Sequence, residues 1–236
     1  MGYRRMSKWG LFVVCFCMVA LVVSGCGKKE TTSMTMAGSV EKTGTVTSEQ
    51  KVIPVPSTAP ITEERSYYDF ETTDLNGWEL PMWVEGKTDY VAKDISFSED
   101  FATSGKGSMK VVSDFPGGQW TAALVEIEQY LDLSNYRVIK ADIYLPTDAP
   151  IGLKAKLILT VGDSWKFVEM SRSVPLVPGE WATITASVEP GSYDWKRVVP
   201  DEVFGEDVRK IAIRITSNRK PKYSGTFYID NLRVGR

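Results

Sequence analysis

Short runs in which apolar and polar residues alternate recur along most of the chain, from Ser66 to Val234. In residues 153–161 every second residue from Leu153 onward is apolar, and Lys154 and Lys156 fall between them. In residues 209–216 three isoleucines occupy alternate positions. A period of two places one face of each strand in a core and the other toward solvent, which is typical of antiparallel sheets.

Ten runs of this kind, separated by clusters of Gly, Pro, Asp and Asn, predict strands. They are Tyr67–Glu71, Tyr90–Phe97, Ser108–Ser113, Trp120–Ile127, Val138–Leu145, Leu153–Val161, Trp165–Ser171, Trp181–Val188, Arg209–Thr216 and Gly225–Arg233. A helical period is almost absent, and short helical turns are expected only within 194–206 and 132–134. The predicted fold class is all-β, a β-sandwich formed by one domain of residues 66–236.

The last predicted strand contains a change of parity. Phe227 and Ile229 share one face, whereas Leu232 falls on the other. A β-bulge at residues 230–231 would restore the alternation and turn the carboxylate of Asp230 inward. We expect this closing strand to lie beside the opening one.

That pairing would bring three acidic residues together. Asp69 and Glu71 lie in the opening strand and Asp230 in the closing one, so the three could share a cation. The alternative is three solvated carboxylates on edge strands.

The first 25 residues have the organisation of a signal peptide. Basic residues at 4, 5 and 8 precede an apolar run, Leu11–Val23, which is short for a membrane span. The run ends in Leu21–Gly27, which resembles a bacterial lipobox. The resemblance implies cleavage before Cys26, a lipid on its sulfur, and anchoring to the outer face of a membrane. The alternative is an uncleaved anchor helix with an incidental cysteine.

Residues 26–65 are rich in Thr, Ser, Lys, Glu and Pro and predict a disordered tether. The remaining cysteines, Cys15 and Cys17, lie within the apolar run, so we expect neither a disulfide nor a thiol catalyst in the domain. The chain has no histidine, which excludes Ser-His-Asp and Cys-His catalysis and histidine metal sites. The slightly acidic balance gives no indication of nucleic-acid binding.

Several phrases occur in an order that resembles a known family. They are Asp69–Glu71, Gly77–Trp78, Ala102–Val111, Asp132–Tyr136, Pro178–Trp181 and Gly225–Asp230. Together they resemble galactose-binding-like jelly-roll modules, in particular the mannan-binding modules of bacterial β-mannanases (carbohydrate-binding module family 27). The resemblance implies a jelly-roll fold, polysaccharide binding and a structural Ca²⁺. The calcium ligands it implies are the side chains of Glu71 and Asp230 and carbonyls near Asp69, Ser104 and Lys106.

Sugar sites in such modules use aromatic side chains as platforms for pyranose rings. Trp83, Trp120 and Trp165 each lie beside a turn, and three platforms match the pattern of the family. The alternative is that each caps the core at a sandwich edge. We expect Trp78 and Trp181 to be core residues, and Trp195 is left undecided.

Polar partners for sugar hydroxyls are expected on the outward faces of the strands. Parity places Arg214, Lys156 and Glu169 there, although such residues are also typical of a solvated surface. The expected function is that of a non-catalytic, monomeric, membrane-anchored lipoprotein that binds β-mannan or a related plant polysaccharide outside the cell. The alternatives are a small glycosidase or lyase, with Glu126, Glu128 or Glu169 as acids, and a structural or protein-interaction domain with buried tryptophans.

Overall fold

The computed structural model describes residues 53–217, 219 and 221–236, so the signal peptide, Cys26 and most of the predicted tether lie outside the described residues. The described part is built from strands and one short 3-10 helix, η1. The strands are β1 (Glu64–Tyr68), β2 (Ala92–Ser98), β3 (Ser108–Pro116), β4 (Ala122–Leu131), β5 (Val138–Tyr144), β6 (Lys154–Val161), β7 (Lys166–Glu169), β8 (Val174–Pro175), β9 (Trp181–Ser187), β10 (Val208–Thr216) and β11 (Lys222–Gly235). All ten predicted strands are confirmed, with ends that shift by a few residues.

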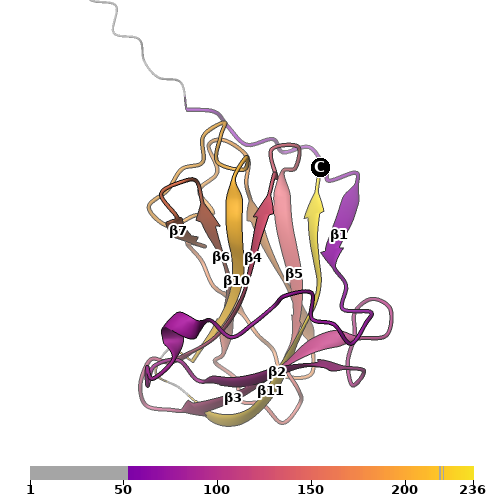
Figure 1. Cartoon of the computed structure of the whole chain (residues 1–236), viewed down its shortest axis with the longest axis vertical. Helices are drawn as coiled ribbons and strands as arrows, with labels where there is room; N and C mark the ends of the chain where they lie inside the picture. Colours follow the sequence, from indigo (N-terminus) through magenta and orange to yellow (C-terminus); the bar gives the residue numbers. More distant parts are fainter. Residues whose placement is uncertain (1–52, 218, 220) are drawn as a thin grey trace, which may run out of the picture. The chain divides into compact units, whose positions relative to one another are not determined.

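Two antiparallel sheets form a sandwich (Figure 1). The six-stranded sheet has the order β2-β3-β11-β5-β9, and β1 pairs with β11. The five-stranded sheet has the order β4-β10-β6-β7, and β8 pairs with β6. The all-β sandwich predicted from the alternation is therefore confirmed.

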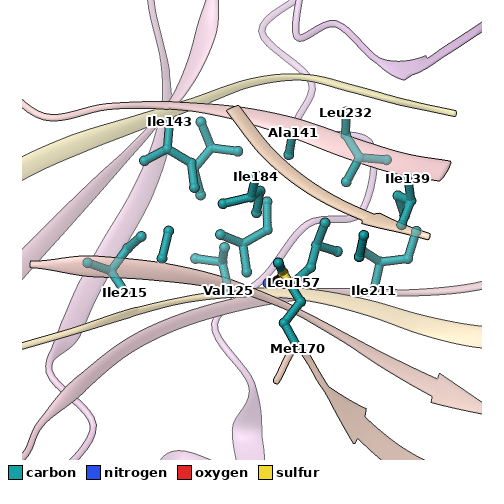
Figure 2. Close-up of a cluster of buried hydrophobic side chains, with 14 of the residues drawn as sticks. Val125, Ile139, Ala141, Ile143, Leu157, Met170, Ile184, Ile211, Ile215 and Leu232 are labelled. Atoms are coloured by element: carbon teal, nitrogen blue, oxygen red, sulfur yellow. Dashed lines mark hydrogen bonds between the residues drawn. The ribbon is translucent and has the colours of Figure 1, made fainter. Parts of the chain in front are cut away.

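The core lies between the two sheets. Figure 2 shows Ile139, Ile143 and Ile184 of the six-stranded sheet facing side chains of the other layer such as Leu157 and Ile211. All five are almost completely buried. Since successive side chains of a strand point to opposite faces, burial of this face of each strand accounts for the two-layer arrangement.

The predicted bulge in β11 is confirmed. Asp230 pairs with Asp142, whereas Arg233 pairs with Lys140, so β11 holds one extra residue here. Asn231 adopts a φ of +50° at this point. The bulge also marks a change of neighbour, because β3 pairs with the strand up to Ile229 and β1 pairs with it beyond the bulge.

The predicted pairing of the first and last strands is likewise confirmed, but the inward direction of the Asp230 carboxylate is wrong. Asp230 is fully buried, and its carboxylate accepts hydrogen bonds from the loop residues Thr103 and Ser104. It lies in register with Asp142, which is bonded to the exposed Thr183. Asp230 is therefore buried on the outer face of the sheet beneath a loop.

The prediction that Trp181 belongs to the core is also wrong. In β9 the residues that face the core are Ile184 and its neighbours of the same parity, and Trp181 has the opposite parity. It lies half-buried in a cross-strand row with Tyr144 and Tyr228, and Phe101 stacks on Tyr144 at 4.3 Å. The row is thus covered by aromatic packing on the outer face of the six-stranded sheet.

Two other tryptophans are core residues. Trp78 is 4% exposed, as predicted, and it packs edge-on against Tyr68. Trp195, which the sequence left undecided, is 2% exposed, and its Nε1 donates a hydrogen bond to the carbonyl oxygen of Ser187 at 2.7 Å.

Residues upstream of Ser66 contact the sandwich. Arg137 donates hydrogen bonds to the carbonyl oxygens of Ser57 and Ala59, and Thr62 pairs with Arg236 through the backbone. The structured unit therefore extends upstream of the predicted boundary.

No helix is assigned at either predicted helical turn; both contain hydrogen-bonded turns instead. The one short helix, η1 (Met82–Val84), was not predicted. None of the helices in the described ranges has the length and apolar character needed to cross a membrane.

Candidate functional site

The outer face of the five-stranded sheet carries a continuous set of polar and apolar side chains. On β10, Lys210, Ala212, Arg214 and Thr216 point away from the core because the alternating isoleucines point into it. Arg214 is in register with Lys156 of β6, and Ala212 with Ile158. This surface is called the outer face below.

The three tryptophans predicted as platforms border this face. Trp120 lies two residues before the start of β4, at the Thr216 end of β10. Trp165 lies in the turn between β6 and β7, at the opposite end. Trp83 belongs to η1, which lies beside β4 because residue 79 bridges to Glu126. The three are 45% (Trp83), 37% (Trp120) and 41% (Trp165) exposed, so none of them is a buried core residue.

Neighbouring side chains hold each ring in place. Trp83 packs edge-on against Tyr90 at 5.1 Å, and its Nε1 donates a hydrogen bond to Glu126 at 3.4 Å. Trp120 also packs edge-on against Tyr90, at 6.3 Å. Tyr90 thus links two of the platforms and fixes their relative position.

Cations also contact the platform rings. The guanidinium of Arg209 lies 5.3 Å from the ring of Trp165, and that of Arg214 lies 6.0 Å from the ring of Trp120. The ammonium of Lys87 lies 4.5 Å from the ring of Trp83. Each contact favours one ring orientation and stabilises it by about 0.5–1 kcal/mol at exposed sites.

Two hollows open along the outer face between the platforms. The first, of about 240 Å³, has an apolar floor and two tryptophans on its rim. Its lining residues are Trp83, Leu124, Glu126, Ile158, Thr160, Trp165, Phe167, Lys210 and Ala212. The second, of about 270 Å³, is polar. Its lining residues are Trp120, Lys154, Lys156, Glu169, Ser173, Lys196, Arg214 and Thr216.

The two hollows adjoin, because Ala212 and Arg214 are successive outward residues of β10 and each lines one of them. From Lys210 to Thr216 the strand advances roughly 20 Å at about 3.3 Å per residue. Together the hollows form an elongated groove with an aromatic side chain at either end. A groove of this kind suits an extended chain ligand better than a single small molecule. A larger hollow of about 690 Å³, lined mainly by residues 80–93, lies beside η1 and shares Leu124 with the first.

The polar hollow is organised around Glu169. Its carboxylate accepts a hydrogen bond from Lys196 at 2.7 Å and forms an ion pair with Arg214, and Lys156 lies 4.0 Å away. Burial acts to raise the pKa of Glu169, but the hydrogen bonds and charges of these cations prevail and lower it. The carboxylate is therefore ionised at neutral pH and acts as a hydrogen-bond acceptor.

The structure brings all six predicted sugar-binding residues, Trp83, Trp120, Trp165, Arg214, Lys156 and Glu169, onto one face. Parity was the signal for the polar three, and proximity to turns was the signal for the tryptophans. Sequence reasoning missed Tyr90, Lys154, Phe167 and Lys196. Lys154 and Phe167 follow from the same parity rule, whereas no sequence signal placed Lys196 here, because it reaches the groove from a loop.

The cluster of three carboxylates expected around a cation does not form among the described residues. Glu71 and Asp230 instead accept hydrogen bonds from backbone N–H groups of one loop. The backbone N–H of Lys106 donates to Glu71 at 2.9 Å, and that of Ser104 donates to Asp230 at 3.1 Å. The loop is therefore held between these two carboxylates. The side chain of Asp69 is exposed and has no hydrogen bond or ion pair to other described residues.

Across the described ranges, no three His, Cys, Asp or Glu side chains converge to hold a metal ion. Burial raises the pKa of Asp230, in opposition to its hydrogen bonds. A hard cation would favour its ionised form, and carboxylate and carbonyl oxygens are the ligands that Ca²⁺ prefers. The two carboxylates fit such an ion only together with backbone carbonyls.

Comparisons with known proteins bear on the fold. No protein-family model matches the chain, and no curated protein matches it. Several solved structures do match the chain. A CBM27 module of Caldicellulosiruptor saccharolyticus, solved in complex with mannohexaose, superposes with a TM-score of 0.52 at 18% identity and covers 73% of this chain and 97% of its own.

A carbohydrate-binding module of family 28, described as specific for non-crystalline cellulose, gives a TM-score of 0.52 at 15% identity, with 74% of this chain and 96% of that chain covered. The chain has the β-sandwich fold of carbohydrate-binding modules. At this level of identity, the likeness establishes the fold, and the function has to be argued from the groove itself.

Proposed function

We propose that this domain binds an extended polysaccharide along the groove on the outer face of the five-stranded sheet, without cleaving it. The observation that carries the proposal is the set of three half-exposed tryptophans, Trp83, Trp120 and Trp165, around a groove with one apolar and one polar section. Flat aromatic side chains bury the apolar face of a sugar ring, and the groups between them can bond its hydroxyls.

β-Mannan or a related plant polysaccharide is the proposed ligand. The support is the ordered set of sequence phrases that resembles the mannan-binding modules, together with the fold shared with a module solved with mannohexaose. We also propose that a lipid on Cys26 anchors the domain to the outer face of a membrane, on the basis of the lipobox-like residues 21–27.

The geometry favours binding over the two alternatives. A glycosidase needs one carboxylic acid whose pKa is raised, whereas that of Glu169 is lowered by its cationic neighbours. The carboxylate of Glu126 accepts hydrogen bonds from Lys210, at 2.9 Å, and from the indole nitrogen of Trp83. A structural domain without a sugar site would bury its tryptophans, but the three platforms expose more than a third of their surface.

A panel of polysaccharides in affinity gel electrophoresis, followed by calorimetry with oligosaccharides of the retarding glycan, tests the proposal. Residues 53–236 with the native fold should be retarded by at least one soluble β-linked polysaccharide and should release no reducing ends from it. Retardation by none of the soluble β-mannans, β-glucans, xylans or polyuronates would overturn the binding proposal, and sustained release of reducing sugar would replace it with the enzyme alternative.

A further inference from the structure

Cationic side chains are concentrated at one end of the groove. The polar hollow is lined by four cations, Lys154, Lys156, Lys196 and Arg214, and by a single acidic residue, Glu169. The hollow therefore carries a formal excess of three positive charges. It is called the cationic pocket below.

The one carboxylate does not neutralise the cluster. The carboxylate of Glu169 already forms ion pairs with Lys196 and Arg214, and it lies 4.0 Å from the ammonium of Lys156. Lys154 forms no ion pair with any acidic side chain in the part of the chain that the structure describes. The Nε of Arg214 is buried without a hydrogen-bond acceptor among the same residues. Positive charge is thus left over inside the pocket.

The excess is local to this end. In the apolar hollow Lys210 is paired with Glu126 at 2.9 Å and with Glu128 at 3.2 Å. Farther along, Arg209 is paired with Asp163 and Asp207. Because the chain as a whole has a formal net charge of −2, the pocket stands out from a surface of opposite overall sign.

The cations at the base of the pocket are shielded from water. The side chains of Lys156 and Arg214 are 13% and 14% exposed. Charges in such positions attract an anion more strongly than fully solvated lysines do. Burial is also the main cause that lowers the pKa of Lys156, and a bound anion would favour its ammonium form. Bonding neutral hydroxyls alone would not call for a surplus of like charges here.

We propose that the cationic pocket beside Trp120 binds the carboxylate of an acidic sugar, so that the glycan held in this groove contains uronic acid. A sugar ring on Trp120 would lie next to Arg214, whose guanidinium is 6.0 Å from the indole ring. Guanidinium and ammonium groups are the preferred partners of carboxylates. This inference rests on the proposed binding of a polysaccharide, and it specifies an acidic glycan in place of the neutral β-mannan proposed above.

Two matched pairs of oligosaccharides test it, because the members of a pair differ only at the C6 group. The pairs are β-1,4-linked hexamannuronate with mannohexaose, and β-1,4-linked hexaglucuronate with cellohexaose. Calorimetry on residues 53–236 should give at least tenfold tighter binding of the acidic member in one pair at low salt, as expected for one charge-assisted contact. Raising NaCl from 50 to 500 mM should weaken the binding of that acidic member and leave its neutral counterpart unchanged.

Three variants locate the effect. Lys154→Gln should weaken binding of the acidic sugar several-fold, whereas Lys222→Gln, which removes the same charge from an exposed site on the other sheet, should not. Glu169→Gln should strengthen it, because the competing carboxylate is lost. If Glu169 instead serves to bond neutral hydroxyls, this substitution weakens binding. Thermal melts of each variant establish that it is folded.

The outcomes separate the inference from the proposed function. Binding of neutral members with no preference for the acidic ones, or an acidic preference unchanged in both Lys154→Gln and Glu169→Gln, would overturn the inference and leave polysaccharide binding in place. Binding of none of the four sugars would overturn the inference, and the broader polysaccharide panel would then decide the proposed function separately.

Discussion

Replacement of Trp120 by alanine should weaken polysaccharide binding while the domain remains folded. Trp120 is 37% exposed and lies between Tyr90 and Arg214, at the junction of the aromatic rim and the polar hollow. Stacking of a ring ligand on one aromatic side chain is worth about 1–3 kcal/mol, by analogy with bases on aromatic residues. At about 1.4 kcal/mol per factor of ten, the dissociation constant should rise about 5- to 150-fold.

The stability cost of this substitution should be smaller than that of a core tryptophan. Truncation of a fully buried tryptophan lowers the free energy of unfolding by about 3–5 kcal/mol. Because more than a third of the Trp120 surface is exposed in the folded domain, its truncation should cost about 2–3 kcal/mol. Trp195→Ala is the matched control, because Trp195 is 2% exposed and also bonds the carbonyl of Ser187. It should lose the full amount of about 3–5 kcal/mol of unfolding free energy. While folded, it should lose less sugar affinity than Trp120→Ala does. Trp120→Phe, which keeps a flat face, should bind nearly as the wild type does.

Calorimetric titration and urea unfolding on the same four proteins measure the two quantities separately. Wild-type affinity in folded Trp120→Ala would refute the assignment of Trp120 as a platform. The same result for Trp83→Ala and Trp165→Ala as well would refute the assignment of the groove.

Three further predictions concern charge, calcium and the anchor. The cationic neighbours of Glu169 lower its pKa in the folded state below the value of about 4.5 expected in the unfolded chain. Ionised Glu169 should therefore stabilise the fold at pH values above about 4.5, and this stabilisation should be lost as the pH falls through the folded-state pKa. The difference in unfolding free energy between wild type and Glu169→Gln should therefore shrink from pH 7 to pH 3, and a difference independent of pH would contradict the ion-pair cluster. If Ca²⁺ binds between Glu71 and Asp230, a chelator should lower the melting temperature of the wild type. It should do the same for Asp69→Ala, which keeps its backbone carbonyl, but not for Asp230→Ala. If the chelator has no effect on the wild type and elemental analysis finds no bound ion, the site is excluded. Cys26→Ala should release the chain from the membrane fraction of cells that process lipoproteins, and normal retention after signal cleavage would rule out the lipid anchor.

The alternation along the chain determined much of the fold. Ile211, Ile213 and Ile215 can be buried together only on one face of a strand, so Arg214 must lie on the other. The same argument placed Lys156 on the outward face of its own strand. The parity slip before Leu232 likewise predicted the bulge, because burying Phe227 and Leu232 on one side requires an extra residue between them.

Only the tertiary structure decided which way several aromatic residues face. One face of β9 carries Trp181 and two threonines, and the other carries Ile184 and two alanines. The alternation alone does not say which of these faces packs into the core. The small residues face inward because the opposite sheet fills that space, and Trp181 is covered instead by Tyr144 of the neighbouring strand. The burial of Trp195 likewise depends on the path of the segment between β9 and β10, in which its ring packs against Phe204.

The groove combines both kinds of information. Each platform tryptophan is beside a turn in the sequence, but Trp83 and Trp120 meet across Tyr90 only because residues 79 and 90 bridge to β4. Lys196 reaches Glu169 only because its loop pairs with the end of β7. The local pattern of residues determined the faces of the strands, because side-chain direction alternates with the backbone. The order of the strands, which sets the cationic pocket beside Trp120, depends on contacts between residues far apart in the sequence, and no local pattern specifies these.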